Sequence, residues 1–255
     1  KKQIYKNNQI IKTTTSLLKE TSLIYASPEE VDIIEEYRKE KQQYFDKIIF
    51  KISPEHIQNI KEYNKILLYR NALLEQKMST LPWDDKTIYL GTKIWEKRTA
   101  FFKDFLIKFN ETQKTIKTLQ KYKIEYIKKE PTNAQNYKTK LKEDLKKTET
   151  GPHKDNIEMY LENEKIKEHG SQGEKKILKY ILKITEAEII KQIKKEKPII
   201  LLDDFFSKLD NENIMKIFSY FHRKFQVIIT TTNTNDQALK NIQKNNKEIK
   251  IFNNK

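Results

Sequence analysis

The sequence predicts an α/β protein in which a small parallel sheet is joined to a long helical arm. From residue 172 onward, helical patterns alternate with two short apolar runs, residues 199–202 and 225–230, as in parallel strands with crossover helices. From residue 28 to residue 122, apolar residues instead recur at helical spacing among lysines and glutamates. Only four glycines and six prolines occur in 255 residues, which favours long regular elements.

Short strands are predicted at the start of the chain. Residues 3–5 and 10–11 flank the turn signal Asn7-Asn8, and residues 22–25 form a third apolar segment. Helix starts follow at Ser27-Pro28-Glu29-Glu30 and Ser53-Pro54-Glu55, where a capping serine precedes a first-turn proline and an acidic residue. The second of these helices carries an apolar stripe that consists of Ile57, Ile60, Tyr63, Leu67 and Leu74.

A third helix is predicted from about residue 84 to 122. Its apolar face consists of Ile88, Trp95, Phe102, Phe105, Leu106 and Phe109. Residues 123–150 are rich in lysine and only weakly patterned, so no element is predicted there. Further along, an alternating strand at 157–161 with a hairpin turn at 162–164 precedes the C-terminal elements: helices at 172–195 and 210–222, the two strands already named, a last helix, and a strand at 249–252.

Charge and composition narrow the classes of partner. With 51 basic and 36 acidic residues the net charge is +15. This charge favours binding to polyanions, because neutralised phosphates release counterions. A lysine-rich codon bias is an alternative explanation of the same excess. The lack of cysteine excludes disulfides, thiol catalysis and cysteine-ligated zinc, and the four histidines lack metal-ligand spacing. No apolar run reaches the ~18 residues of a membrane span and no signal peptide is visible, so we expect a cytoplasmic protein without a membrane anchor.

Two aspartates follow the apolar run at 199–202. Asp203 and Asp204 would stand at the carboxyl edge of the sheet, where open α/β sheets bind ligands. If the strand continues, their side chains face opposite ways, so that one carboxylate contacts Mg²⁺ through water and the other polarises an attacking water. A turn or helix-cap pair is the alternative, but the four aliphatic residues before them favour the metal interpretation.

Ser171 and Gly173 stand where the helix at 172–195 begins. A serine among glycines at a helix N-terminus can bind an anion, because free N–H groups and the positive end of the helix dipole meet there. Taken alone, Ser171 with Glu174 is better explained as a capping box. Asp210 is expected at least to cap the next helix, and the hydroxyls of Thr230, Thr231 and Thr232 end the second strand near the same edge.

In order and spacing, these segments resemble motifs of an ABC-type ATPase head. Residues 171–174 resemble its signature motif, 199–204 its Walker B strand, 207–210 its D-loop, and 230–233 its terminal switch. Three further segments are similar to the RecF family of bacterial recombination mediators: Tyr-Ala-Ser-Pro-Glu-Glu at 25–30, Tyr-Arg-Asn-Ala-Leu-Leu at 69–74, and Thr-Gly-Pro-His-Lys-Asp at 150–155. The resemblance covers nearly the whole chain.

This resemblance implies an ABC/SMC-like P-loop ATPase head, with its N-terminal part missing and an α-helical arm domain inserted. Residues 1–30 would be a remnant of head lobe I, residues 31–150 the arm, and residues 151–255 the head lobe with signature, Walker B, D-loop and switch. It also implies ATP and Mg²⁺ as cofactors, weak DNA-dependent ATPase activity, and a homodimer that forms on ATP binding at gaps between single-stranded and duplex DNA. Such a protein would cooperate with RecO and RecR to load RecA in recombinational repair and the SOS response.

The resemblance further implies a role for each candidate residue. Asp203 would support Mg²⁺, Asp204 would activate water, and Ser171 and Gly173 would close on the nucleotide of the partner subunit. Asp210 would communicate across the dimer, and Thr232 would belong to the switch.

Two features depart from the family pattern. The phosphate loop ending in Gly-Lys-Ser/Thr does not occur in these 255 residues; since the family carries it upstream of this segment, we expect a truncated record or a degraded gene, and very weak autonomous ATP binding. Glu174 replaces the family's usual Gln, and a carboxylate suits a helix N-terminus but is unfavourable beside phosphate. Glu174→Gln is therefore predicted to strengthen ATP-driven dimerisation.

Two other functions stay open. One is a non-catalytic DNA-binding scaffold that descends from an SMC-like head and no longer uses ATP. The other is a different SMC-like head, such as a transporter subunit, which is disfavoured by the basic charge and because residues 28–150 are too few for a long SMC coiled coil.

Overall fold

A computed structural model describes residues 4–6, 9–11, 22–27, 33–117, 121–129, 131, 133–206, 209–231 and 237–245. As predicted, the chain opens with strands β1 (Ile4–Lys6) and β2 (Gln9–Ile11), which pair antiparallel. Within the ranges given, no helix is long and apolar enough to cross a membrane. Four predictions fall wholly or mainly outside the described residues: the turn at 7–8, the helix start at 27–30, the side chain of Thr232 and the strand at 249–252.

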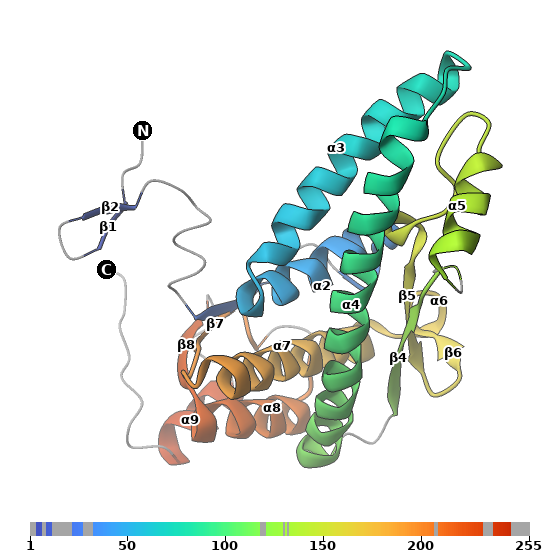
Figure 1. Cartoon of the computed structure of the whole chain (residues 1–255). Coiled ribbons are helices and arrows are strands. Elements are labelled where there is room, and N and C mark those ends of the chain that lie inside the picture. The colour runs from blue at the N-terminus through green and yellow to red at the C-terminus, as the bar shows by residue number, and fades with distance from the viewer. Residues whose placement is uncertain are drawn as a thin grey trace.

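The head contains the predicted parallel sheet, with strand order β3-β7-β8. Its strands β7 and β8 follow helices α7 and α8, which lie side by side in Figure 1. One face of the sheet is fully buried against these helices, because Ile24, Ile200 and Leu202 have no exposed surface. The bounds are β3 (Leu23–Ala26), α7 (Gln172–Lys194), β7 (Ile199–Asp203), α8 (Asn211–Lys224), β8 (Gln226–Thr230) and α9 (Gln237–Asn245).

The opposite face of this sheet is open in the part of the chain that the structure describes. Leu23, Tyr25, Ile199 and Ile228 are 43, 41, 38 and 47% exposed, and the register places them on one face. In β7 the residues alternate in burial although four aliphatic residues stand in a row, as in a strand with one covered face.

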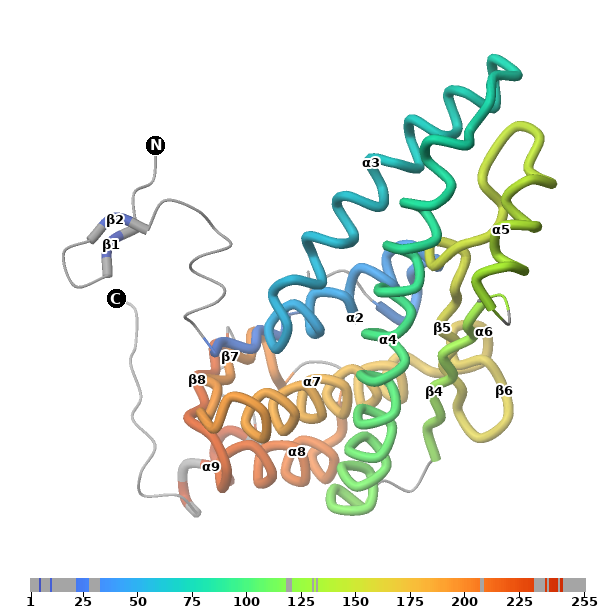
Figure 2. The backbone as a smooth tube through the Cα atoms, viewed as in Figure 1, coloured from blue at the N-terminus to red at the C-terminus, as the bar shows by residue number. Residues whose placement is uncertain are grey.

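The arm is a hairpin of two long helices that extends away from the head (Figures 1 and 2). Helix α2 (Arg38–Ile52) leads into α3 (Glu55–Glu75), which begins directly after Pro54 as predicted. Helix α4 (Leu81–Ile116) returns along α3 and continues down to α7 and α8. It ends six residues before the predicted residue 122, because Lys117 adopts the left-handed conformation (φ 56°) and the chain then enters a strand.

A second, antiparallel sheet follows the arm, with order β4-β5-β6. The strand and hairpin predicted around residues 157–164 are confirmed, but β4 and α5 lie in the lysine-rich segment where no element was predicted. The bounds are β4 (Tyr122–Ile127), α5 (Ala134–Lys142), the 3₁₀ turn η1 (Pro152–Lys154), β5 (Asn156–Leu161), β6 (Glu164–Lys165) and α6 (Ile166–His169).

One hydrophobic core joins the base of the arm to both sheets. It includes Phe45 of α2, Phe105 of α4, Ile124 of β4, Ile181 of α7 and Leu202 of β7, all of them buried. Arm and head are thus packed against each other through apolar side chains, so the base of α4 has no freedom to swing without exposing this core.

Candidate functional site

Asp203 ends β7 between two hydroxyl donors from the neighbouring strands. Tyr25 of β3 donates its hydroxyl to Asp203 Oδ2 at 3.2 Å, and the Thr230 hydroxyl of β8 donates to Asp203 Oδ1. Parallel pairing explains this convergence, since Asp203 pairs with Thr230 and β3 runs alongside. The carboxylate is therefore held in one orientation at the carboxyl edge of the sheet.

Asp204 turns the chain away from the strand. Its φ of 46° is left-handed, and its N–H donates to the Thr230 carbonyl at 3.1 Å. The strand ends at Asp203, so the condition under which the two side chains would face opposite ways is not met. Asp204 lies beside α7, where Lys176 binds its carbonyl oxygen, and burial together with the Asp204 charge raises the pKa of the Tyr180 hydroxyl.

Lys176 joins this turn to the first turns of α7. Its Nζ donates to the carbonyl oxygens of Asp204 and Phe205 at 3.4 and 3.3 Å. The Phe205 ring is fully buried and packs edge-on against Tyr180, with centroids 5.2 Å apart. The helix that begins next to Ser171 and the turn that carries the aspartates are therefore fixed to each other, although Ser171 itself contacts neither aspartate in any hydrogen bond of the described residues.

Ser171 forms the predicted capping box with Glu174. The Ser171 N–H and hydroxyl both donate to Glu174 Oε2 at 2.8 Å, and the Glu174 N–H donates to Ser171 Oγ at 3.3 Å. The Glu174 carboxylate thus occupies the position that an external anion would take at this helix N-terminus. Gly173 lies in the first turn of the same helix.

Asp210 caps α8 as predicted. Its carboxylate accepts from the Asn213 N–H at 2.8 Å and from Asn213 Nδ2 at 2.7 Å, and the N–H bond lowers the pKa of Asp210. Its role across a dimer stays a prediction.

The residues at this edge can hold Mg²⁺ only together with water and phosphate oxygens, as in nucleotide-binding sites. Both oxygens of Asp203 already accept one hydrogen bond, and each keeps a further lone pair. Among the described residues, no group of three or more acidic, histidine or cysteine side chains converges as a metal cage would require. Mg²⁺ commonly uses one or two carboxylates together with water and substrate phosphates, and Asp203 can serve as such a ligand or hold such a water.

Tyr25 and Lys176 are site residues that the sequence did not reveal. The register of β3 against a strand 176 positions later sets the place of Tyr25, and no local pattern encodes such a pairing. Lys176 is one lysine among many along the chain, so only the packing of α7 against the turn singles it out.

The segment Thr150–Asp155 is not at this edge but at the base of the arm. Asp155 is fully buried, and its carboxylate accepts four hydrogen bonds, from Arg98 Nη1 (3.0 Å), Trp95 Nε1 (2.9 Å), the Tyr126 hydroxyl (2.6 Å) and the Lys129 N–H (2.9 Å). Arg98 also binds both carboxylate oxygens of Asp46 on α2, at 3.0 and 2.7 Å. Burial opposes ionisation of Asp46, but Arg98 and His56 outweigh it and lower its pKa.

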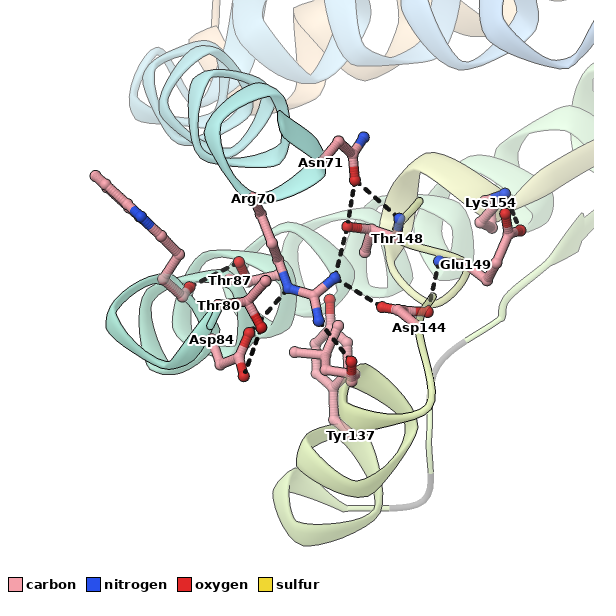
Figure 3. Close-up of polar contacts among 12 residues, drawn as sticks. Arg70, Asn71, Thr80, Asp84, Thr87, Tyr137, Asp144, Thr148, Glu149 and Lys154 are labelled. Carbon is pink, nitrogen blue, oxygen red and sulfur yellow. Dashed lines mark hydrogen bonds and ion pairs between the residues drawn. The ribbon is translucent and has the colours of Figure 1, made fainter. Parts of the chain in front are cut away.

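The segment Tyr69–Leu74 serves a second buried cluster farther out on the arm (Figure 3). Arg70 is fully buried and donates to Asp84 at 2.8 Å, to Asp144 at 2.7 Å, to Thr148 at 2.8 Å and to the Leu141 carbonyl at 2.5 Å. Asn71 accepts from the Thr148 N–H and hydroxyl, both at 2.8 Å. This cluster fixes the segment after α5 against α3 and α4.

His153 links the two clusters. Its Nε2 lies 3.0 Å from the Thr148 carbonyl, which can only accept, and its Nδ1 lies 3.0 Å from the Tyr63 hydroxyl. Neutral His153 satisfies both contacts when Nε2 carries the proton and Nδ1 accepts. Gly151 precedes it with φ 150°, and a Cβ there would lie 2.0 Å from the Tyr63 hydroxyl, so only glycine fits.

The described residues also line a pocket of about 410 Å³ between the end of α4 and α8. Lys117, Tyr220 and Arg223 border it, and none of the predicted site residues does. It therefore plays no part in the arrangement around Asp203.

Comparison with solved structures defines the class of fold. No family model matches the chain. A structure described as the recombination mediator protein RecF with ATP in the RecFOR pathway superposes on 93% of the chain and 70% of its own, with a TM-score of 0.76 and 26% identity. Strand β7 of the parallel sheet ends in Asp203, and the arm is inserted in the chain between β3 and β7. The fold is thus that of an ABC/SMC-like ATPase head with a helical arm.

Curated relatives define the family. The RecF protein of Thermoanaerobacter sp. strain X514, a DNA replication and repair protein, is 31% identical over 258 residues, which cover 92% of the chain and 70% of that protein. The RecF protein of Lachnoclostridium phytofermentans is 30% identical over 215 residues, or 79% of the chain and 59% of that protein. The chain belongs to the RecF family, and it spans 59 to 70% of the length of these two relatives.

Proposed function

We propose that the chain acts in DNA replication and repair as a RecF-type protein that binds DNA as an ATP-dependent homodimer. The observation that carries this proposal is the aspartate edge: Asp203 fixed by Tyr25 and Thr230, next to a turn that Lys176 ties to the Ser171 helix. A family relative has been solved with ATP, which supports the same use of the edge here.

Each residue of the edge has a proposed task. Asp203 holds Mg²⁺ through water, and the Asp204 carboxylate orients the water that attacks the terminal phosphate. Ser171 and Gly173 meet the triphosphate held by the partner subunit, Asp210 communicates between subunits, and Thr232 completes the switch. Mg²⁺, when bound, supplies charge neutralisation at the phosphates.

The phosphate cradle of this site is not within these 255 residues. The residues present thus fit the metal and the partner-facing side of a nucleotide site, but not the β- and γ-phosphate cradle itself. We propose residues 1–30 as part of head lobe I, 31–150 as the arm and 151–255 as the second head lobe. RecO, RecR and RecA are the proposed protein partners, since the solved relative is described in the RecFOR pathway, and the proposed location is the cytoplasm.

Retention of DNA tests this function. The protein expressed from its complete reading frame is loaded onto immobilised gapped duplex DNA with ATP and Mg²⁺, and its dissociation is followed after dilution. Asp204→Asn should prolong retention several-fold over wild type, because ATP closes the dimer but is not hydrolysed. Asp104→Asn, on an exposed position of α4, is the matched control and should leave retention unchanged. Unchanged retention in Asp204→Asn would remove Asp204 from its proposed role.

A DNA-binding scaffold that does not use ATP is the second candidate. One observation favours it: the Glu174 carboxylate already lies at the N-terminus of the Ser171 helix. This candidate predicts DNA retention that is identical with and without ATP, in the wild type and in Asp204→Asn alike.

A further inference from the structure

One segment of the arm combines a fixed backbone with a concentration of positive charge: α5 and the loop at 143–149 that follows it. Its outward-facing cations are Lys140, Lys142, Lys146 and Lys147, all exposed. We call these four residues, together with Leu145, the α5 basic surface. The carboxylates near it are Glu143 and Glu149, and Glu149 is bound by Lys154.

The loop is held from the inside by the Arg70 cluster. Asp144 and Thr148 point inward and bind the buried guanidinium at 2.7 and 2.8 Å, as Figure 3 shows. The Glu149 N–H closes the loop by donating to Asp144 Oδ1 at 3.0 Å. Because both ends are fixed, the residues between them, 145–147, face solvent on a defined backbone.

Leu145 has no place in the core. It is 82% exposed, the largest exposed fraction among the large hydrophobic side chains described, and it lies directly before Lys146 and Lys147. A partner that covers this side chain would remove its apolar surface from water, which favours binding.

Three lysines on the long helices of the arm are bound by acids. Lys86, Lys97 and Lys108 form ion pairs with Glu62, Glu55 and Glu111, at 2.7, 3.0 and 2.5 Å. On the α5 basic surface, Asp144 is bound by Arg70, whereas Glu143, directly after Lys142, is exposed. Among the described residues, none of the four lysines of the α5 basic surface takes part in such an ion pair.

We propose that the α5 basic surface is a contact for the phosphate backbone of duplex DNA. The four lysines neutralise phosphates, and Leu145 packs against sugar or base edges in the groove between them. A loop that is ordered before binding loses little conformational entropy on contact. The surface carries no aromatic side chain on which bases of a single strand could stack, so duplex is favoured. This inference rests on the proposed DNA binding and names where part of it occurs.

Fluorescence anisotropy with a labelled duplex of about 30 base pairs, between about 50 and 200 mM KCl, tests this proposal. The surface variant carries Lys140→Gln, Lys142→Gln, Lys146→Gln and Lys147→Gln. The matched control replaces four exposed lysines elsewhere, Lys61, Lys103, Lys114 and Lys121, by Gln. The surface variant should lose about tenfold or more in affinity and reduce the salt slope by about 3.6, since each of the four phosphate contacts contributes about 0.9; the control should lose less than about twofold. Thermal unfolding verifies that both variants fold.

Leu145→Ala separates apolar contact from charge. It should weaken duplex binding by about threefold without changing the salt slope, because no phosphate contact is lost. An unchanged affinity would remove Leu145 from the contact.

Three results would overturn the inference. Equal losses in the two quadruple variants would mean that net charge acts without a site. If polyglutamate displaces the labelled duplex as effectively as unlabelled duplex of equal charge does, an acidic protein is the better occupant of the surface. If the surface variant binds duplex DNA as tightly as the wild type does, the contact lies elsewhere, and the proposed function stands. A wild type that fails to bind duplex even at low salt would instead refute DNA binding itself.

Discussion

The base of the arm and the aspartate edge of the sheet contain similar residue types in opposite surroundings. At the base, Asp155 is completely buried and accepts four hydrogen bonds. At the edge, Asp203 is partly exposed, accepts two bonds from hydroxyls, and borders an open apolar face. A buried carboxylate whose lone pairs are all used in hydrogen bonds stabilises the fold. A carboxylate with spare lone pairs and access to solvent can bind a ligand.

The same comparison divides the segments that carry the resemblance to the RecF family. The segment at 150–155 packs at the base of the arm through His153 and Asp155, and the segment at 69–74 fixes the loop after α5 through Arg70. The segments at 171–174 and 199–204 form the edge where chemistry is proposed. Family resemblance alone does not separate these two groups, but burial and hydrogen bonding do.

Removal of the Asp155 carboxylate is expected to have the largest effect. Asp155→Ala leaves Arg98 with one fewer partner and leaves three further donors unsatisfied in a buried place, which should lower the free energy of unfolding by about 3–5 kcal/mol. Asp203→Ala, at the exposed edge, should cost less than about 1 kcal/mol. Urea denaturation measures both. Similar losses in the two variants would remove the distinction between the regions.

A side chain at Gly151 should come next. Gly151→Ala forces a β-carbon into a φ of 150° and against the Tyr63 hydroxyl, so we expect a loss of about 2 kcal/mol or more. Gly173→Ala, in the first turn of α7, is the control and should be neutral or slightly stabilising. A tolerated Gly151→Ala in the same denaturation assay would show that the 150–155 turn is not constrained as described.

The pH dependence of stability tests His153. Burial, with Lys154 and Arg38 nearby, lowers its pKa below the ordinary value, against an opposing contribution from Asp155. The unfolded chain then binds more protons below about pH 6.5, so stability is present above that pH and is lost as pH falls. His153→Gln should reduce the slope between about pH 7 and 5 by at most about 1.4 kcal/mol per pH unit. Equal slopes in wild type and variant would exclude a buried neutral His153.

The smallest change in stability is expected at the capping box. Glu174→Gln removes the charge that binds Ser171 and should cost less than about 1 kcal/mol in urea denaturation. It should nevertheless strengthen ATP-driven dimerisation, because it removes a negative charge that repels the phosphates. Light scattering with and without ATP measures this, and unchanged or weaker dimerisation would show that Glu174 does not compete with nucleotide.

The sequence predicted the elements whose signals are local. Pro54 marked the start of α3, Ser171 and Asp210 marked their helices as caps, and alternation marked β5. It missed β4 and α5 because lysines on their exposed faces outnumber the few buried anchors such as Tyr137 and Leu141.

At the site, the sequence revealed the aspartate pair but not the residues that surround it. The left-handed Asp204 and the bond from Tyr25 depend on pairing between strands far apart in sequence. The open face of β7 was likewise hidden, since four aliphatic residues in a row give no sign of which face is covered.

The central claim is that Ser171 of one subunit faces the aspartate edge of another across a nucleotide, and a crosslink tests it most directly. These 255 residues contain no cysteine, so Ser171→Cys in one copy and Thr231→Cys, directly after β8, in another place thiols on the two proposed surfaces. A short thiol-specific crosslinker should join the mixed copies when ATP and Mg²⁺ are present and not when ATP is omitted. A crosslink that is absent with ATP, or equally abundant without it, would contradict the account.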